Sequence, residues 1–139
     1  MTIEVHGTAL SAPCRLVYIT CEVLGIDYTT IEVDLLKGGQ HAPQYLKLNP
    51  QHNVPTMVDG KLVMNESRAI AAYLGSMAST YGGNAKLYPM KDIKTKAIID
   101  QRLHFDAGTF YKAFADCVVS FEILCKSKES IIFYLFSIR

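Results

Sequence analysis

The sequence predicts an α/β fold in which a strand–helix–strand unit precedes a hairpin and a second helix. Segments rich in β-branched residues alternate polar and apolar positions, as strands do, and between them apolar residues recur at helical steps of three and four. An Asp-Gly pair separates two strand-like segments, and this pair is the strongest short sign of a tight hairpin. The predicted order is therefore βαβ followed by ββα.

The strand–helix–strand unit comes first. Residues 2–8 and 28–36 are the predicted strands, and a helix between two such strands implies a right-handed parallel crossover. Ser11 can cap this helix, Pro13 suits its first turn and Gly25 is a natural stop. The apolar stripe predicted for this helix consists of Leu16, Ile19 and Val23.

The hairpin and the second helix follow. Residues 54–58 and 61–64 are the two predicted strands, joined by a turn at Asp59-Gly60. Ser67 belongs to a residue class that favours helix N-caps, so the second helix should begin there. The apolar residues at helical spacing in this helix are Ile70, Leu74 and Met77.

Two places in this region could bind a ligand. A cis Val54–Pro55 bond would leave the Val54 backbone N–H and C=O able to pair with an extended, peptide-like ligand. The start of the helix near Ser67 offers backbone N–H groups and the positive end of a dipole to an anion. A plainer interpretation, an edge strand that begins at Pro55 and an ordinary capped helix, explains the same residues.

The rest of the chain is predicted to be helical after a linker. Residues 76–89 are polar and contain Gly82-Gly83, which is typical of a linker. A long helix should run from about residue 91 to residue 117. We interpret most of its apolar stripe as core packing. This stripe consists of Ile99, Leu103, Ala107, Phe110, Phe114 and Val118.

Composition argues against several classes of function. The chain has 139 residues and a net charge of +1, so nothing favours binding to nucleic acid or to an anionic membrane. We expect no signal peptide, and no apolar run reaches the ~18 residues of a membrane span. Four cysteines without a CxxC pair favour reduced thiols in the cytoplasm, and four scattered histidines argue against a metal site.

Three segments carry several motifs in a fixed order. They read LSAPCRLVYITCEVLGIDY (10–28), NPQHNVPTMVDGKLVMNESRAIAAYL (49–74) and KLYPMKDIKTKAIIDQRLHFDAGTFY (86–111). In these motifs, over about residues 2–117, the chain resembles a cytosolic glutathione S-transferase of the arthropod delta and epsilon type. The resemblance implies a thioredoxin-like domain at 1–78, a linker at 79–89 and the start of an all-helical C-terminal domain at 90–139. It also implies a homodimer that conjugates glutathione, its co-substrate, to hydrophobic electrophiles in detoxification, without a metal.

The resemblance gives Ser11 the catalytic role of donating a hydrogen bond to the glutathione thiolate. A cysteine thiol has a pKa of about 8.5, which must fall by ~2 units, or ~2.7 kcal/mol, to give an effective nucleophile at neutral pH. A hydrogen bond to a charged group contributes about 1.5 to 3 kcal/mol, and a helix N-terminus adds ~0.3 to 1. One hydroxyl is enough in principle. From the residues alone, Ser11 is equally a plain N-cap.

The resemblance also implies residues that bind glutathione. His52 would contact its glycyl end, although a lone histidine there is more often a surface loop residue. The backbone of Val54, beside Pro55, would pair with the cysteinyl part. Glu66 and Ser67 would hold the γ-glutamyl amine and carboxylate.

The roles of several other positions stay open. Arg68 matches a residue near the ligand and the dimer seam, and a solvated helix charge is its plainer interpretation. The second loop histidine of the family falls at Gln40, with His41 adjacent, so either residue could contact the glycyl carboxylate. A short helix is predicted at residues 43–48, beside the ligand. The positions that match the neighbourhood of the electrophile pocket are His104, Tyr111 and Phe114.

Two further expectations concern Cys14 and the residues after Val118. Cys14 stands where the family often has a cysteine, and we predict it to be buried and inert. After Val118 the resemblance fades, and residues 130–138 form an uncharged run that is aggregation-prone when exposed. We expect a truncated or alternatively spliced product, or a misjoined gene model. The alternative function is a truncated, non-catalytic glutathione-binding or interaction fragment, and a thioredoxin-like redox protein is disfavoured because it would need a dithiol.

Overall fold

One mixed sheet organises the described part of the molecule. The computed structural model describes residues 2–78 and 85–117. The strand order is β2-β1-β3-β4, with β1 and β2 parallel and the other neighbours antiparallel. The strands are β1 (Ile3–Gly7), β2 (Tyr28–Glu32), β3 (Thr56–Asp59) and β4 (Leu62–Met64). The helices are α1 (Ala12–Leu24), α2 (Pro43–Leu48), α3 (Ser67–Met77) and α4 (Ile93–Phe105).

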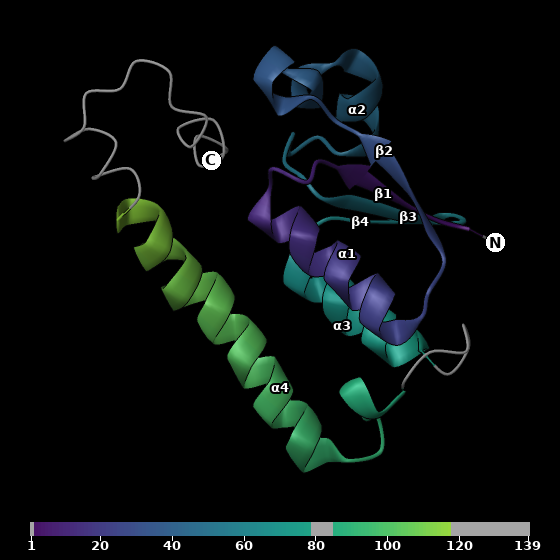
Figure 1. The fold of residues 1–139 in the computed structure, drawn as a ribbon, viewed down its shortest axis with the longest axis vertical. Helices are drawn as coiled ribbons and strands as arrows, with labels where there is room; N and C mark the ends of the chain where they lie inside the picture. The colour runs from purple at the N-terminus through teal and green to yellow at the C-terminus, as the bar shows by residue number, and fades with distance from the viewer. Residues whose placement is uncertain (1, 79–84, 118–139) are drawn as a thin grey trace.

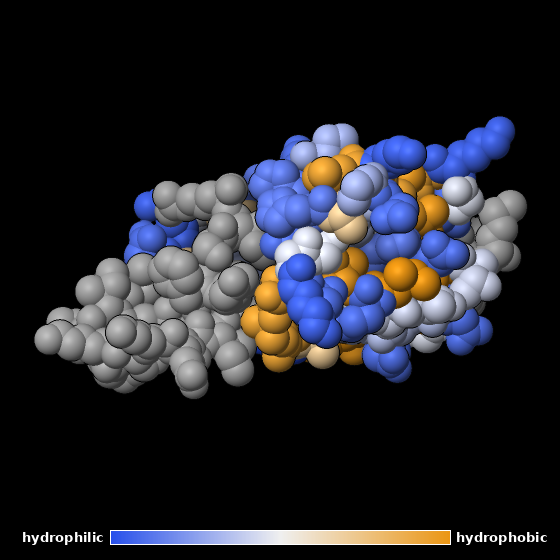
Figure 2. All heavy atoms as spheres, turned by 90° about the horizontal axis from the view of Figure 1, so that it is seen from above, coloured by the Kyte–Doolittle hydropathy of each residue, from blue (hydrophilic) through white to orange (hydrophobic). Residues whose placement is uncertain are grey.

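Along the chain the elements follow the predicted order, βαβ and then ββα, so this prediction is confirmed. Helices α1 and α3 lie side by side on one face of the sheet, α2 lies on the other side, and α4 runs diagonally past α1 and α3 (Figure 1). Seen from above, the surface is mostly hydrophilic with smaller hydrophobic patches (Figure 2). The main core lies between the sheet and the pair α1 and α3. Its fully buried members include Ile3, Val5, Val17, Cys21, Met57, Ile70 and Leu74.

Helix α1 has the predicted start and stop. The Cys14 backbone N–H donates to Ser11 Oγ at 3.4 Å, which makes Ser11 the N-cap, and Pro13 lies in the first turn. Gly25 ends the helix at φ 68°, a left-handed conformation that favours glycine. Local side-chain and backbone chemistry therefore sets both ends of this helix.

The stripe predicted for α1 does not face the main core. Ile19 is 60% exposed and Val23 is 56% exposed, whereas Val17, Cys21 and Leu24 are buried against the sheet. Both faces of α1 carry apolar residues, so periodicity alone could not select the one that meets the sheet. The stripe lines a hollow of about 270 Å³ between α1, α3 and α4. Other residues that line this hollow include Ala71, Gly75, Leu87, Tyr88, Ile99 and Leu103.

The second strand is shorter than predicted. β2 ends at Glu32 because Asp34 caps a 3₁₀ turn at Leu35–Lys37. Asp34 Oδ1 accepts the backbone N–H groups of Leu36 and Lys37 at 3.1 and 3.2 Å. Of the apolar residues that alternate in the predicted strand, Val33 and Leu35 are buried, whereas Ile31 is 38% exposed.

The hairpin loop is shifted by one residue from the prediction, whereas α3 begins at the predicted residue. Asp59 pairs with Leu62, so the two loop residues are Gly60 and Lys61, and Gly60 has a φ of +59°. Glu66, with a φ of 68°, is the N-cap of α3, and Ser67 is its first helical residue. The predicted start of the helix at Ser67 is confirmed, but Ser67 is not the cap, and the Glu66 side chain makes no capping hydrogen bond.

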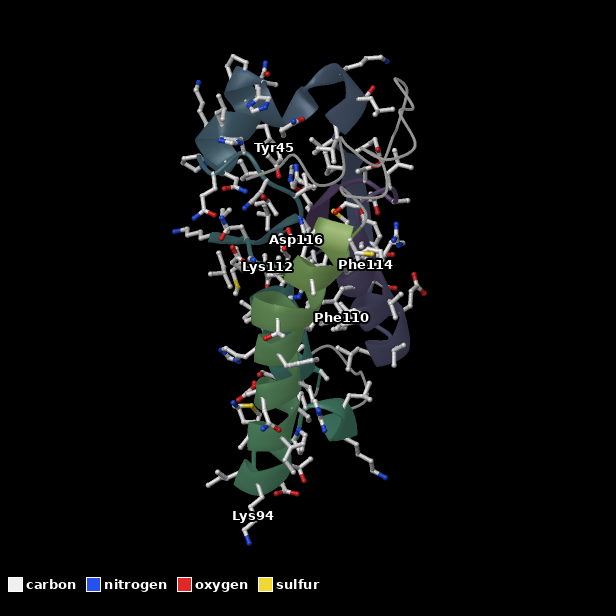
Figure 3. The ribbon with its side chains drawn as sticks, turned by 90° about the vertical axis from the view of Figure 1, so that its left-hand side faces the viewer. Tyr45, Lys94, Phe110, Lys112, Phe114 and Asp116 are labelled. Carbon is white, nitrogen blue, oxygen red and sulfur yellow. The ribbon has the colours of Figure 1, made fainter. Side chains whose placement is uncertain are left out.

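The predicted long helix is interrupted. It begins at Ile93, where Asp92 Oδ1 accepts the Thr95 N–H at 3.1 Å, and a π turn at Asp106–Phe110 separates α4 from helical residues 111–117. Core packing of the stripe is not observed in the described range, where no residue of α4 or of the π turn is buried. Phe110 and Phe114 lie on one side of the helix and Lys112 on the other (Figure 3). The described residues do not include residues 79–84 of the linker, Val118 or the tail that follows it.

At Gly75, α3 lies close against the segment that leads into α4. A Cβ on Gly75 would lie 2.6 Å from the Cβ of Tyr88, which is buried. We expect Gly75→Ala to lower the free energy of unfolding by about 1 to 2 kcal/mol, because neither backbone can yield easily. Gly108→Ala, where a Cβ meets nothing within 4 Å, should be neutral or stabilising by up to ~1 kcal/mol. Urea unfolding compares the two variants, and equal effects would show that the contact at Tyr88 does not matter.

Candidate functional site

The strand register brings three loop segments to one end of the sheet. His6 near the end of β1 pairs with Thr56 at the start of β3, and Met57 pairs with Met64 at the end of β4. The chain that leaves β1 toward α1, the chain that enters β3 and the chain that leaves β4 toward α3 therefore meet at this end. Predicted site residues from all three segments lie here: Ser11, Val54, Pro55, Glu66 and Ser67.

Ser11 is held at the first of these segments. Its backbone N–H donates to Thr8 O at 3.1 Å, and its side chain is the N-cap of α1. Ser11 is only 6% exposed. The structure therefore fixes a hydroxyl at a helix N-terminus, a position from which it can donate a hydrogen bond to a ligand atom at this end of the sheet.

Val54 and Pro55 form the second segment. The bond between them is cis, and both residues are buried. Val54 packs with Cys14 and Leu35 in a second, smaller core cluster, so this segment lies against the start of α1. Among the described residues, neither the N–H nor the C=O of Val54 has a hydrogen-bond partner. Both groups can therefore pair with an extended ligand.

Asn49 holds the loop that carries this segment, and sequence reasoning missed it. Its amide Nδ2 donates to Asn53 O at 3.0 Å and to Thr56 Oγ1 at 3.0 Å, and its Oδ1 accepts from Asn65 Nδ2 at 3.1 Å. The Tyr45 hydroxyl donates to Asn53 O at 2.6 Å. Asn49 thus joins the loop before β3 to the residue before Glu66. Its place in a turn-forming Asn-Pro pair was the available sign.

The candidates for the glycyl end lie close together. The rings of His41 and His52 are 4.9 Å apart between centroids, and His52 has a φ of +47°. Gln40 is buried, and within the described ranges its Oε1 has no hydrogen-bond partner. A buried acceptor without a donor is unusual in a folded protein and can be satisfied by a ligand or a water. The structure thus keeps both Gln40 and His41 as candidates.

Arg68 is not a solvated helix charge. Its side chain is 17% exposed, Nη1 donates to Ser67 Oγ at 3.0 Å, and Nε donates to Asp106 Oδ2 at 2.6 Å. Nη2 forms an ion pair with the same carboxylate. The guanidinium carbon lies 4.9 Å from the centre of the Tyr111 ring. Arg68 therefore connects the start of α3 to the helix that follows α4.

The π turn explains how Asp106 and Tyr111 both reach Arg68. The Tyr111 backbone N–H bonds to Asp106 O, five residues earlier, and this wider turn sets the two residues on the same side. Burial raises the pKa of Tyr111, and the charge of Arg68 opposes that rise. Asp106 is a second site residue that sequence reasoning missed. Gly108, inside an otherwise helical pattern, was a weak sign of irregularity.

The other predicted pocket residues behave differently. His104 is exposed, and its Nδ1 lies 2.8 Å from the backbone O of Asp100 in its own helix. Phe114 is 48% exposed. The Tyr111 ring lies 4.9 Å from the guanidinium carbon of Arg68, which places it beside the start of α3. Of the three residues, Tyr111 is the one that the structure brings to the site.

Both cysteines of α1 are buried thiols. Cys14 is buried as predicted, and burial raises its pKa; burial also raises the pKa of Cys21 to about 11. In residues 2–78 and 85–117, no group of three or more His, Cys, Asp or Glu side chains could hold a metal ion. The helices in those ranges are too short or too polar to cross a membrane.

Comparison with known proteins gives clear relatives. A family model described as the N-terminal domain of glutathione S-transferase matches residues 5–83. Glutathione S-transferase D7 of Anopheles gambiae is 44% identical over 116 residues, which are 84% of this chain and 51% of that protein. A delta-class glutathione transferase of Nilaparvata lugens has a TM-score of 0.73 at 45% identity, with 82% of this chain and 52% of that chain covered. The chain spans about half the length of the relatives it matches.

A further solved structure bears on the ligand. A glutathione transferase homologue of Drosophila mojavensis, solved with bound glutathione, has a TM-score of 0.70 at 38% identity, with 77% of this chain and 47% of that chain covered. The sheet order and its flanking helices thus define a thioredoxin-like domain with a helical segment attached. The chain belongs to the glutathione S-transferase family, and its resemblance to the insect delta and epsilon types is confirmed.

Proposed function

We propose that this chain binds glutathione and uses its thiolate to attack hydrophobic electrophiles, as a glutathione transferase in detoxification. The observation that carries the proposal is the meeting, at one end of the sheet, of a helix-capping hydroxyl, an unpaired strand edge and a second helix start. These three features match the sulfur, the backbone and the γ-glutamyl carboxylate of one tripeptide. The homologue with bound glutathione supports the ligand.

Each part of glutathione has a proposed partner. The N–H and C=O of Val54, next to Pro55, pair with the cysteinyl backbone, and Glu66 and Ser67 hold the γ-glutamyl amine and carboxylate. The start of α3 adds its dipole to the carboxylate site, and Arg68 orients the Ser67 hydroxyl through the 3.0 Å contact. The glycyl carboxylate lies near His52, with Gln40 or His41 as its second contact.

Ser11 is the proposed catalytic residue. It donates its proton in a hydrogen bond to the glutathione sulfur and does not itself attack. The hydrogen bond and the dipole of α1 both favour the charged sulfur, so they lower the pKa of the bound thiol. The thiolate then forms a bond to the electrophilic carbon, and the leaving group departs with the electron pair. Tyr111 lines the proposed electrophile side, and His104 before it and Phe114 after it remain further candidates there.

The proposed organisation keeps the boundaries at 1–78, 79–89 and 90–139, a homodimer as the assembly and the cytoplasm as the location. One observation favours the alternative of a non-catalytic glutathione-binding or interaction fragment. In the described range no residue of α4 is buried, and the apolar stripe of α1 lines an open hollow beside it. An electrophile pocket needs walls that this part of the chain only begins to form.

Two measurements together test the proposal. We expect the full chain to be retained on glutathione-agarose, to be eluted by free glutathione, and to conjugate 1-chloro-2,4-dinitrobenzene above the uncatalysed rate. Retention without turnover would support the fragment, because the glutathione site would be intact while the electrophile side was not. Loss of both would contradict the glutathione site itself. A circular dichroism spectrum confirms that the protein tested is folded.

A further inference from the structure

A tight turn before Ser11 joins β1 to α1. The Ser11 backbone N–H donates to Thr8 O at 3.1 Å, so Ala9 and Leu10 are the two central residues of this turn. Thr8 is buried, whereas Leu10 is 43% exposed. In the described part of the chain, the backbone groups of Ala9 and Leu10 form no hydrogen bond with another backbone group. Backbone pairing therefore fixes the two ends of the turn but not its middle.

Arg15 supplies the bonds that hold the middle of the turn. Its Nη1 donates to Ala9 O at 2.8 Å and to Leu10 O at 3.1 Å. The Arg15 backbone N–H donates to Ser11 O at 3.0 Å, so the same residue also closes the first turn of α1. Hydrogen bonds from a charged donor are stronger than those between neutral groups. Ser11 thus lies between a turn and a helix that Arg15 joins together.

The two carbonyl groups, and not a carboxylate, set the place of the guanidinium. None of the ion pairs formed within residues 2–78 and 85–117 includes Arg15, and the first turn of α1 contains no acidic residue. The helix dipole opposes a cation near the N-terminus of a helix. The bonds to Ala9 and Leu10 are therefore what keeps this side chain folded back over the turn. Arg68, at the start of α3, differs because Asp106 neutralises it.

We infer that Arg15 is a positioning residue for Ser11: it fixes the turn before the serine, so that the hydroxyl stays where it can donate to the glutathione sulfur. The inference rests on the proposed function. Ser11 Oγ accepts the Cys14 N–H at 3.4 Å, a long bond that holds the hydroxyl only weakly. A shift of the Ser11 backbone therefore moves the hydroxyl with it, and a misplaced donor stabilises the thiolate less.

The main test measures the pKa of the bound glutathione thiol by the ultraviolet absorbance of its thiolate across pH, at saturating glutathione. We expect Arg15→Ala to raise this pKa by about half a unit, which is roughly threefold less thiolate at a pH below it. KM for glutathione should stay nearly unchanged, because the other proposed contacts, at Val54, Glu66 and Ser67, belong to other segments. A loss of stability alone would not produce this combination.

Two further variants serve as rescue and control. Arg15→Lys should restore part of the pKa shift, because both carbonyl bonds come from one nitrogen and an ammonium group can also donate to two acceptors. Arg102→Ala is the matched control, because Arg102 is an exposed arginine of α4 whose loss removes the same charge and leaves the turn intact. It should leave the pKa of the bound thiol unchanged.

Backbone hydrogen exchange tests the turn itself, without glutathione. In Arg15→Ala the amides of residues 9–11 should exchange about tenfold faster than in the unmodified chain, because the turn opens more often. The amides of β1 should keep their exchange rates. Unchanged exchange at residues 9–11 would show that Arg15 does not hold the turn, and the inference would be wrong.

The outcomes separate this inference from the proposed function. If the unmodified chain shows no thiolate absorbance with glutathione, the proposed function fails and the inference fails with it. If the unmodified chain ionises glutathione and Arg15→Ala has the same pKa, the inference alone is wrong. If Arg102→Ala shifts the pKa as much as Arg15→Ala does, the lost charge explains the effect and the positioning role is also wrong. Circular dichroism of each variant confirms that it is folded.

Discussion

Ser11→Ala is expected to lower kcat/KM for glutathione conjugation by about 100-fold. The variant loses one hydrogen bond to a charged sulfur, which contributes ~1.5 to 3 kcal/mol, and 1.4 kcal/mol corresponds to a factor of ten in rate. The pKa of the bound thiol should rise for the same reason, because the hydrogen bond favours the charged form. Steady-state kinetics at several pH values measure both effects. The loss should shrink as pH rises above the pKa of free glutathione, where the thiol ionises without help.

Ser11 also caps α1, so alanine is expected to cost ~1 kcal/mol of stability as well. Ser11→Gly separates the two roles, because glycine is nearly as good as serine at an N-cap but has no hydroxyl. The glycine variant should lose as much activity as the alanine variant while its free energy of unfolding falls by only a few tenths of a kcal/mol. A glycine variant with normal activity would show that the hydroxyl serves only as a cap.

Arg68→Ala is expected to have the largest effect on stability, a loss of about 2 kcal/mol in the free energy of unfolding, and to weaken glutathione binding about tenfold. The variant removes the bonds to Ser67 Oγ and Asp106 Oδ2 and the contact with the Tyr111 ring. The stability figure lies below the range for fully buried pairs because the Asp106 side chain is 37% exposed and solvent screens its charge. Urea unfolding and isothermal titration with glutathione measure the two effects.

An exposed ion pair within helical residues 111–117, the helix that contains Tyr111, supplies the control. Lys112 Nζ lies 3.4 Å from Asp116 Oδ2, and the two side chains are 65% and 57% exposed. Lys112→Gln should change stability by no more than ~0.5 kcal/mol, as is usual for an exposed i,i+4 pair. Asp106→Asn should resemble Arg68→Ala in stability. If Arg68→Ala and Lys112→Gln had equal effects, the link from α3 to the helix after α4 would be unimportant.

Local chemistry made some boundaries predictable. Ser11 and Gly25 bound α1 because a capping side chain and a left-handed glycine act within one turn of the chain. The Asp-Gly pair correctly predicted that a hairpin joins β3 and β4, but the loop lies one residue later than predicted. The pairing of Asp59 with Leu62 across the strands, and not the dipeptide, fixes the loop. The start of α3 at Ser67 was also predictable, although its N-cap is Glu66.

Other features depended on contacts between distant parts of the chain. The core face of α1 was not predictable, because Val17 and Val23 are equally apolar and only the sheet distinguishes them. The roles of Asn49 and Asp106 were not predicted for the same reason. Their hydrogen-bond partners, Thr56 and Arg68, are brought to them only by the fold. Arg68 was placed near the ligand by resemblance, but its pairing with Asp106 required the π turn.

The sequence by itself determined the order of the elements, the ends of α1 and the chemical type of each residue at the proposed glutathione site, because these depend on neighbours within a few positions. The tertiary structure decided which residues meet: Cys14 with Val54, Asn49 with Thr56, and Arg68 with Asp106. The physical reason is that strand register and the packing of helices on the sheet, which involve residues far apart in the chain, set the direction in which each side chain points.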